Sequence, residues 1–179
     1  MHIVGPELNA RPQCEAVLRS LPMWFGIEEA LQMYADDTLR LPTFAACDDH
    51  RAAGVAEGEG DGERIVGFVT LMKHFEHAWE VYCIALHAEF RDQGIGRALL
   101  GHAEAWLIAQ GVSLLQVKTV AATSASAAYG LTRGFYDKLG FQPLEVFPTL
   151  WSVRNPALQL VKFLAVADPS RHRNQTPRP

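Results

Sequence analysis

The spacing of apolar residues along this 179-residue chain alternates between two periods. Apolar residues recur every three or four positions from Cys14 to Leu21 and from Ile27 to Leu39, which predicts two amphipathic helices. Runs rich in β-branched and aromatic residues at Thr43–Cys47, Arg64–Met72 and Trp79–Leu86 predict strands. The third run is nearly all apolar, which is typical of a strand covered on both faces.

Helical spacing returns after Gly94 and stops before Gly111, a residue suited to the positive φ of a helix C-terminus. A strand is expected next, at Leu114–Val120. A strand, a helix and a second strand in this order almost always cross over right-handedly, so the two strands should be parallel. A further helix is expected from Ala128 to Leu139, closed by Gly140.

The rest of the chain divides into two more strands and two stretches without a core. The strands are expected at Phe141–Phe147 and Ala157–Leu164. Residues 48–63 are acidic and glycine-rich, and residues 168–179 are polar with several prolines, so we expect an exposed loop and a disordered tail. With no repeat and no second core, we expect a single α/β domain over residues 1–167.

Charge and composition restrict the possible functions. The net charge of −4 argues against the basic face of a nucleic-acid-binding protein, so no nucleic-acid partner is expected. No apolar run reaches the ~20 residues of a membrane span, and no secretory leader is visible, so a cytoplasmic protein is expected. The three cysteines are widely spaced and fit neither a disulfide framework nor a zinc site, and no metal is expected.

The stretch EFRDQGIGRALL, residues 89–100, predicts an anion site between a strand and a helix. The first amides of a helix lack intrahelical partners and carry the positive end of the helix dipole. Gly94 and Gly96 would let those amides approach a diphosphate closely, with Arg91 and Arg97 at the rim. The stretch matches neither a Walker loop nor the dinucleotide pattern. A tight turn with no ligand is the alternative.

Two segments together resemble the GCN5-related N-acetyltransferases (GNAT). Arg91-Asp92-Gln93-Gly94-Ile95-Gly96 is similar to the family's pyrophosphate signature, and GFYDKLGFQPL, about 40 residues later, is similar to its closing motif. Further similarity up to about residue 164 points to a bacterial subgroup whose substrates are mostly unassigned. The resemblance implies a mixed α+β sheet of six or seven strands with about four helices, the acyl-CoA N-acyltransferase fold.

The resemblance also implies how acetyl-CoA would be held. The strand before the turn would separate from its neighbour, and the backbone of Ile84 and Leu86 would hold the cofactor arm and polarise the acetyl oxygen. Amides from Arg91 to Arg97 would take the pyrophosphate. Where many family members have asparagine, this chain has Tyr129. The residues assigned to the cofactor are Ile84, Ala85, Leu86, Arg91, Asp92, Gln93, Gly94, Ile95, Gly96, Arg97 and Tyr129.

Two residues are the candidates for acid–base chemistry. Tyr136 occupies the position of the family's tyrosine and would protonate the departing thiolate. Glu80 is the first candidate for the base, because alternation would place it on one strand face with Tyr82, Ile84 and Leu86. Without the resemblance, Tyr136 would be a packed aromatic, and Glu80 fits a solvated strand end equally well.

Other polar residues have weaker assignments. His74, Glu76 and His77 would line the acceptor site or simply lie in an exposed turn. Lys118 and Thr119 would reach the acceptor pocket or cap a strand.

The functional hypothesis is direct acetyl transfer from acetyl-CoA to a primary amine of a small molecule or peptide. An acetyl-cysteine route through Cys83 is the less favoured path, because that residue lies in an apolar strand. Two alternatives are a non-catalytic acyl-CoA sensor and an enzyme acetylating the amino acid of a charged tRNA. The acceptor pocket would involve the N-terminal helices, the acidic loop at 48–63 and residues 73–77. A homodimer would use the C-terminal strand or the Trp151 region.

Overall fold

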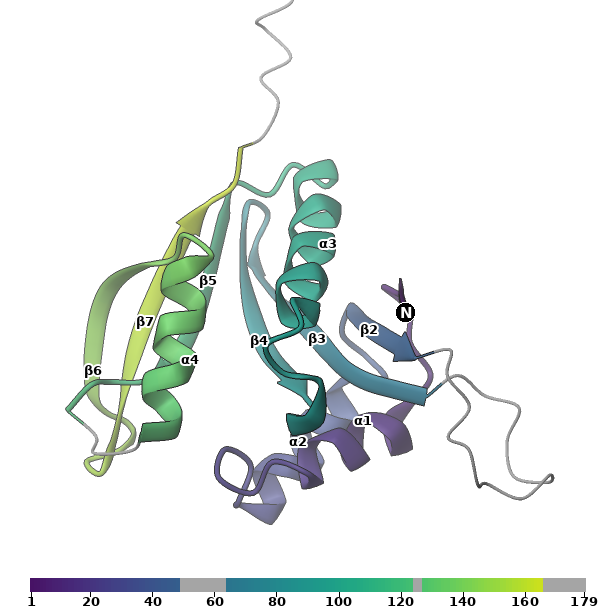
Figure 1. The fold of residues 1–179 in the computed structure, drawn as a ribbon. Helices are drawn as coiled ribbons and strands as arrows, with labels where there is room; N and C mark the ends of the chain where they lie inside the picture. The colour runs from purple at the N-terminus through teal and green to yellow at the C-terminus, as the bar shows by residue number, and fades with distance from the viewer. Residues whose placement is uncertain (49–63, 124–126, 166–179) are drawn as a thin grey trace, which may run out of the picture.

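The computed structural model describes residues 1–48, 64–123 and 127–165 and shows a seven-stranded sheet with helices on both faces (Figure 1). The loop expected at 48–63 and the tail expected at 168–179 lie outside these residues, apart from Asp48, which ends a strand. The elements are β1 (His2–Val4), α1 (Arg11–Arg19), α2 (Glu28–Asp37), β2 (Thr43–Asp48), β3 (Arg64–Phe75), β4 (Ala78–Leu86), a 3-10 turn (Ala88–Phe90), α3 (Ile95–Ala109), β5 (Leu114–Val120), α4 (Ala127–Lys138), β6 (Gln142–Ser152) and β7 (Asn155–Phe163).

The strands lie in the order β1-β2-β3-β4-β5-β7-β6. Every neighbouring pair is antiparallel except β4 and β5, which are parallel and joined through α3. This confirms the strand, helix and strand unit expected from the spacing. The helix ends at Ala109, and Gly111, just beyond it, has the expected positive φ of +77°. The mixed α/β fold is therefore confirmed.

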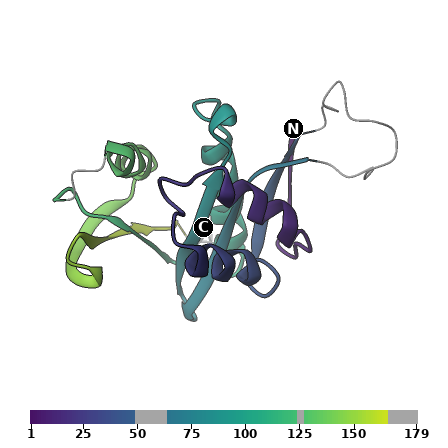
Figure 2. The same cartoon turned by 90° about the horizontal axis from the view of Figure 1, so that it is seen from below.

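Two apolar clusters lie on opposite faces of the sheet. Helices α3 and α4 contribute Leu99, Leu107 and Tyr136 to one cluster, together with Val81 of β4. Helices α1 and α2 cover the other face, where their buried residues pack with Phe68, Cys83 and Ala85 of the sheet. Figure 2 shows α1 and α2 lying against the sheet on the side away from α3. Burial on both faces explains why β4 is almost entirely apolar.

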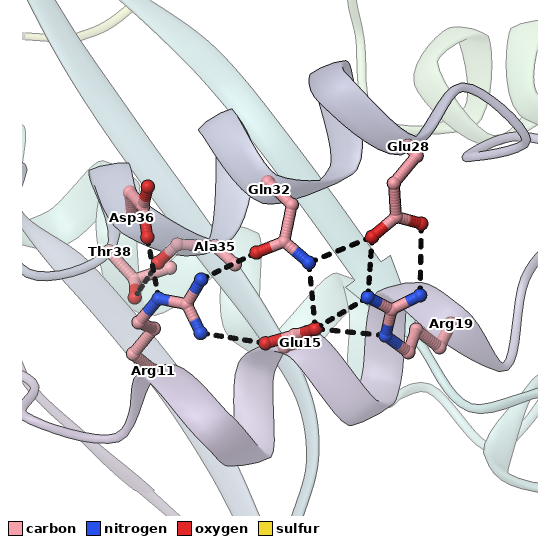
Figure 3. A network of polar contacts seen from close by, with 8 residues as sticks. All are labelled: Arg11, Glu15, Arg19, Glu28, Gln32, Ala35, Asp36 and Thr38. Atoms are coloured by element: carbon pink, nitrogen blue, oxygen red, sulfur yellow. Dashed lines mark hydrogen bonds and ion pairs between the residues drawn. The ribbon is translucent and has the colours of Figure 1, made fainter.

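Helices α1 and α2 are tied together by a polar network on their outer surface (Figure 3). Arg11 donates to Gln32 at 2.6 Å and to Glu15 at 2.7 Å, and Arg19 donates to Glu28 at 2.6 Å. Gln32 in turn donates to Glu15 and to Glu28, both at 2.9 Å. The hydrogen bonds from Arg19 lower the pKa of Glu28 to about 2. The network joins the two helices through side chains of both.

Some boundaries differ from those expected. Strand β1 was not predicted, because three residues are too short to show a period. Strand β3 extends to Phe75 and so includes His74, which rules out the exposed turn as one of the two expected places for this residue. The C-terminal strand is not an exposed edge for dimerisation, since β7 pairs with β5 on one side and β6 on the other. Among the described residues, no helix is long and apolar enough to cross a membrane.

Candidate active site

The parallel strands β4 and β5 separate part of the way along their length. They pair from Ala78 and Leu114 as far as Val81 and Val117, and no further. Beyond that point β4 stays with β3, and β5 stays with β7 as far as Val120. Each strand therefore has an edge without a strand partner in the middle of the sheet, and Figure 1 shows the two strands diverging.

A β-bulge at Tyr82 lies where the separation begins. Thr70 of β3 pairs with Cys83, whereas the next residue, Leu71, pairs with Val81, so Tyr82 is the extra residue. A bulge shifts the alternation of side chains by one. The expectation that Glu80 shares a face with Ile84 and Leu86 is therefore wrong.

The two apolar clusters confirm this shift. Val81, Ile84 and Leu86 belong to the cluster under α3 and α4, although alternation alone would separate the first from the other two. Glu80 lies on the other face, the one that α1 and α2 partly cover. The sheet thus separates Glu80 from the face that carries Ile84 and Leu86.

The hydrogen-bonding pattern between β3 and β4 shows which backbone groups of β4 have no strand partner. The amide of His87 donates to the carbonyl of Val66 at 2.9 Å, and Gly67 stands opposite Leu86. In an antiparallel ladder this makes Leu86, and likewise Ile84, a position whose N–H and C=O point away from β3. These N–H and C=O groups point toward the side of β4 where β5 no longer pairs. Ala85 directs its polar backbone groups to β3, so its backbone is not available to a cofactor.

The N-terminus of α3 supplies a second set of free donors. The amides of residues 92–97 have no hydrogen-bond partner within the described part of the chain, and the first helical bond is Ala98 to Gly94. Asp92 and Gly94 adopt positive φ of 60° and 81°, which turns the chain into the helix. Arg91 differs from the expectation, because its amide already donates to Ala88 at 3.2 Å.

The two glycines of the turn serve different purposes. A Cβ on Gly94 would meet nothing within 4 Å, so this position requires glycine for its left-handed backbone. A Cβ on Gly96 would lie 3.2 Å from Cε2 of Phe135 on α4, so this position requires glycine for close packing of α3 against α4. The side chain of Arg97 is exposed.

Tyr136 lies on α4 and faces the cluster between α3, α4 and the sheet. It is 3% exposed, and its ring makes edge contacts with Phe135 and Phe141. Burial, followed by the electrostatic influence of Cys83 and Glu80, raises the pKa of the phenol. Its hydroxyl has no hydrogen-bond partner in the described ranges. The structure thus holds a neutral phenol with a free proton donor.

Glu80 is buried on the opposite face and is fully hydrogen-bonded at one oxygen. Its Oε2 accepts bonds from His74 Nε2 at 2.6 Å, Lys118 Nζ at 2.6 Å and Gln116 Nε2 at 2.9 Å. Gln159 of β7 extends the cluster by donating to Gln116. Glu80 is therefore not a solvated strand-end charge.

Lys118 and Thr119 lie on opposite faces of β5. Lys118 joins Glu80, while Thr119 alternates with it and so shares the face of Val117, toward α3 and α4. The hydroxyl of Thr119 is buried and has no partner in the part of the chain described. Thr119 therefore does not face the acceptor side.

The contacts that connect the turn between α1 and α2 with α4 and with Arg91 were not predicted from the sequence. Trp24, in the turn between α1 and α2, donates from Nε1 to Thr132 of α4 at 3.1 Å. The guanidinium of Arg91 lies 4.3 Å from the centre of the Trp24 ring. Tyr129 of α4 is half-buried, and after burial, Cys83 and Glu80 it adds to the raised pKa of Tyr34 on α2, so the two phenols lie near each other. The missed signal was the aromatic pair Trp24-Phe25, which follows the first helix.

Cys83 is a buried free thiol on β4. Burial, with a smaller contribution from Cys14, raises its pKa well above the usual range. A thiol held in the protonated form is a poor nucleophile. The geometry therefore disfavours an acetyl-cysteine route.

The chain is similar to known acetyltransferases in sequence and in fold. The model of the acetyltransferase (GNAT) family matches residues 18–141. The crystal structure of an acetyltransferase of that family from Desulfovibrio desulfuricans has a TM-score of 0.73 at 19% identity, covering 92% of this chain and 99% of that one. An aminoglycoside 6′-N-acetyltransferase complexed with coenzyme A has a TM-score of 0.68 at 17% identity, covering 100% and 99%.

A third similar structure is that of an enzyme that acts on a protein. It is the ribosomal-protein-S18-alanine N-acetyltransferase from Escherichia coli, with a TM-score of 0.65 at 20% identity, covering 94% of this chain and 96% of that one. At these identities the structural similarity shows a shared fold alone, and the family model supplies the relationship.

Proposed function

Since the chain belongs to the acetyltransferase (GNAT) family, we propose that it transfers an acetyl group from acetyl-CoA directly to a primary amine of a small molecule or peptide. The chain is an N-acetyltransferase by family, and the donor, the direct route and the acceptor class are the proposed part. The observation that carries the proposal is the open edge of β4 directly before the free amides of α3.

The open edge and the helix end suit the two parts of acetyl-CoA. The backbone groups of Ile84 and Leu86 would bond the amides of the pantetheine arm, as an added strand would. The amides of residues 92–97, at the positive end of α3, would hold the diphosphate. The solved relative that contains coenzyme A supports this choice of donor. Acetyl-CoA supplies the activated acetyl group.

Tyr136 would act as the general acid. The raised pKa keeps its phenol protonated at neutral pH, and its position between α4 and the open edge directs it to the sulfur that leaves. An unpartnered hydroxyl in a buried site is suited to this donation, because no other acceptor competes for its proton.

The acceptor amine would approach from the face that carries Glu80. The carboxylate oxygen Oε1 has no hydrogen-bond partner in the described residues, so it can accept from the ammonium group or from a water bound to it. Solved relatives act on an aminoglycoside and on a ribosomal protein, which supports an amine acceptor without choosing between the two kinds. Glu80, the first candidate for the base, would thereby hold the amine where its proton can be removed, either by the carboxylate itself or by a group bonded to it.

The proposal is tested by incubating the pure protein with acetyl-CoA and a panel of aminoglycosides, polyamines, amino acids and peptides, and by measuring thiol release. We expect turnover with at least one amine, and a reduction of kcat of about 100-fold or more in Tyr136→Phe, the usual contribution of a general acid. Tyr34→Phe is the matched control, because Tyr34 lies on α2 in the opposite cluster.

The alternative functions predict different results in these assays. Coenzyme A binding with no turnover on any amine would favour an acyl-CoA sensor. Turnover with an unchanged kcat in Tyr136→Phe at saturating acetyl-CoA would remove Tyr136 from its role. Strongly salt-dependent binding of charged tRNA would favour the tRNA alternative.

A further inference from the structure

The polar cluster around Glu80 has an asymmetry that the general mechanism does not explain. All three donors, His74, Gln116 and Lys118, converge on Oε2, at 2.6 to 2.9 Å. Protonation of that oxygen would displace at least one of them. The acetyl-transfer reaction nevertheless produces a proton that must leave the acceptor side.

Two irregularities of the sheet bring His74 to this position. Lys73 pairs with Trp79, whereas Phe75 pairs with Ala78, so His74 is the extra residue of a bulge in β3. Bulges redirect a side chain and are frequent beside active sites. Together with the bulge at Tyr82, this places His74 and Glu80 on one face, between two breaks in regular pairing.

The two members of the pair differ in their access to solvent. The side chain of Glu80 is 9% exposed, whereas that of His74 is 34% exposed. The hydrogen bond through Nε2 leaves Nδ1 as the second ring nitrogen. Because a carboxylate only accepts hydrogen bonds, Nε2 carries the proton and neutral His74 has its lone pair on Nδ1.

Resting on the proposed acetyl transfer, we propose that His74 is the terminal proton acceptor of the reaction and that Glu80 is its positioning residue. Nδ1 of His74 takes one proton from the acceptor ammonium through a water that Oε1 of Glu80 also binds. The freed lone pair forms the C–N bond as the C–S bond breaks, and Tyr136 protonates the departing sulfur. The second proton shed by the nitrogen restores the Tyr136 phenol, and His74 passes its proton to solvent.

Groups of both charges surround His74. The charged groups facing it from the neighbouring strands are Glu80 on β4 and Lys118 on β5, and Lys73 and Glu76 flank it on its own hairpin. Glu80 contacts the ring directly, and Lys118 bonds to the same carboxylate oxygen.

The kinetic test compares His74→Gln, His74→Ala and Glu80→Gln with His77→Gln across pH 5.5 to 9, using the best amine of the panel. His77 is the matched control, because it is an exposed histidine of the same hairpin that bonds to the carbonyl of Gly111 and not to the cluster. We expect kcat to fall about 100-fold in His74→Gln, with KM for acetyl-CoA unchanged. Imidazole changes protonation between pH 5 and 8, so the acid limb of the wild-type profile should disappear. Added imidazole should restore part of the kcat that His74→Ala loses.

A second measurement does not depend on turnover. Nitrogen-15 NMR of the histidine side chains at pH 8 should show the Nε2–H tautomer for His74, and Glu80→Gln should change it. A His74→Gln profile equal to that of His77→Gln, or an Nδ1–H tautomer, would overturn the proposal. Wild-type protein with no activity on any amine would instead count against the proposed function, and the tautomer would then decide the inference alone.

Discussion

Tyr136 and Thr119 show how single residues of the site differ from ordinary core positions. Both are buried, at 3% and 4% exposure, on the face that α3 and α4 cover. Neither hydroxyl bonds to another described residue. Of the two, the hydroxyl of Thr119 is wholly buried without a partner, which costs about 1 to 3 kcal/mol. Such a group, where β4 and β5 have separated, is consistent with a site that is completed only when a ligand is bound.

Thr119→Val should stabilise the protein in the absence of ligand. The change removes the unsatisfied hydroxyl and keeps a β-branched side chain of similar shape, so we expect a gain of about 1 kcal/mol in the free energy of unfolding. Urea denaturation measures it. Thr43→Val is the control, because the hydroxyl of Thr43 bonds to Leu41 and Thr70, and its loss should destabilise. A Thr119→Val protein that is less stable than wild type would show that the hydroxyl has a partner.

At the scale of elements, the helix that begins at Ile95 carries two glycine requirements of different kinds. Gly94 requires a left-handed backbone and has open space around it, whereas Gly96 is in contact with Phe135. The sequence predicted a glycine turn and a helix N-terminus correctly, because both depend on local chemistry. It could not separate the two glycines, since the neighbour of Gly96 lies about 40 residues away in the chain.

Gly94→Ala and Gly96→Ala should therefore affect the protein differently. Gly94→Ala should lower the free energy of unfolding by about 1 kcal/mol through backbone strain. Gly96→Ala should displace Phe135 and the adjacent Tyr136, and so lower kcat more than it lowers stability. Steady-state kinetics with acetyl-CoA and urea denaturation of both variants measure this. Gly101→Ala is the control, since a Cβ there meets nothing within 4 Å. Equal effects of the two substitutions on stability and on kcat would contradict the distinction.

The strand bulges show what the sequence could not predict. The apolar run of β4 predicts a covered strand, and strict alternation then places Glu80 with Ile84. The bulge at Tyr82 reverses that assignment, and it depends on how Thr70 and Leu71 of another strand pair with β4. Alternation within one strand carries no information about an extra residue relative to its partner. The sequence therefore placed Tyr136 correctly on its helix, whereas the face that it predicted for Glu80 was wrong.

The whole molecule consists of two clusters held on either side of a sheet that opens in its middle. Several titratable groups are buried in these clusters. Burial raises the pKa of Cys14 and the pKa of Tyr34 to about 12 each, and it raises the pKa of Tyr82, Cys83 and Tyr136 further. All of these groups are neutral when protonated, so the folded protein favours their protonated forms.

Stability should consequently fall in alkaline solution. A group whose pKa is higher in the folded state stabilises fully below its unfolded value, here 9.0 for Cys14 and 10.0 for Tyr34, and loses that effect as pH rises through about 12. The free energy of unfolding, measured with urea, should not decrease through these groups up to pH 9 and should decrease from pH 9 to 11. A rising value over that interval would show that the thiols and phenols are not buried as described.

The most direct test of the central claim is a crystal structure of the protein with coenzyme A. We expect the pantetheine arm along the open edge of β4, bonded to the backbone of Ile84 and Leu86. We also expect the diphosphate within hydrogen-bond distance of amides in residues 92–97, and the sulfur beside the Tyr136 hydroxyl. Coenzyme A bound elsewhere, or β4 and β5 paired along their full length in the complex, would contradict it.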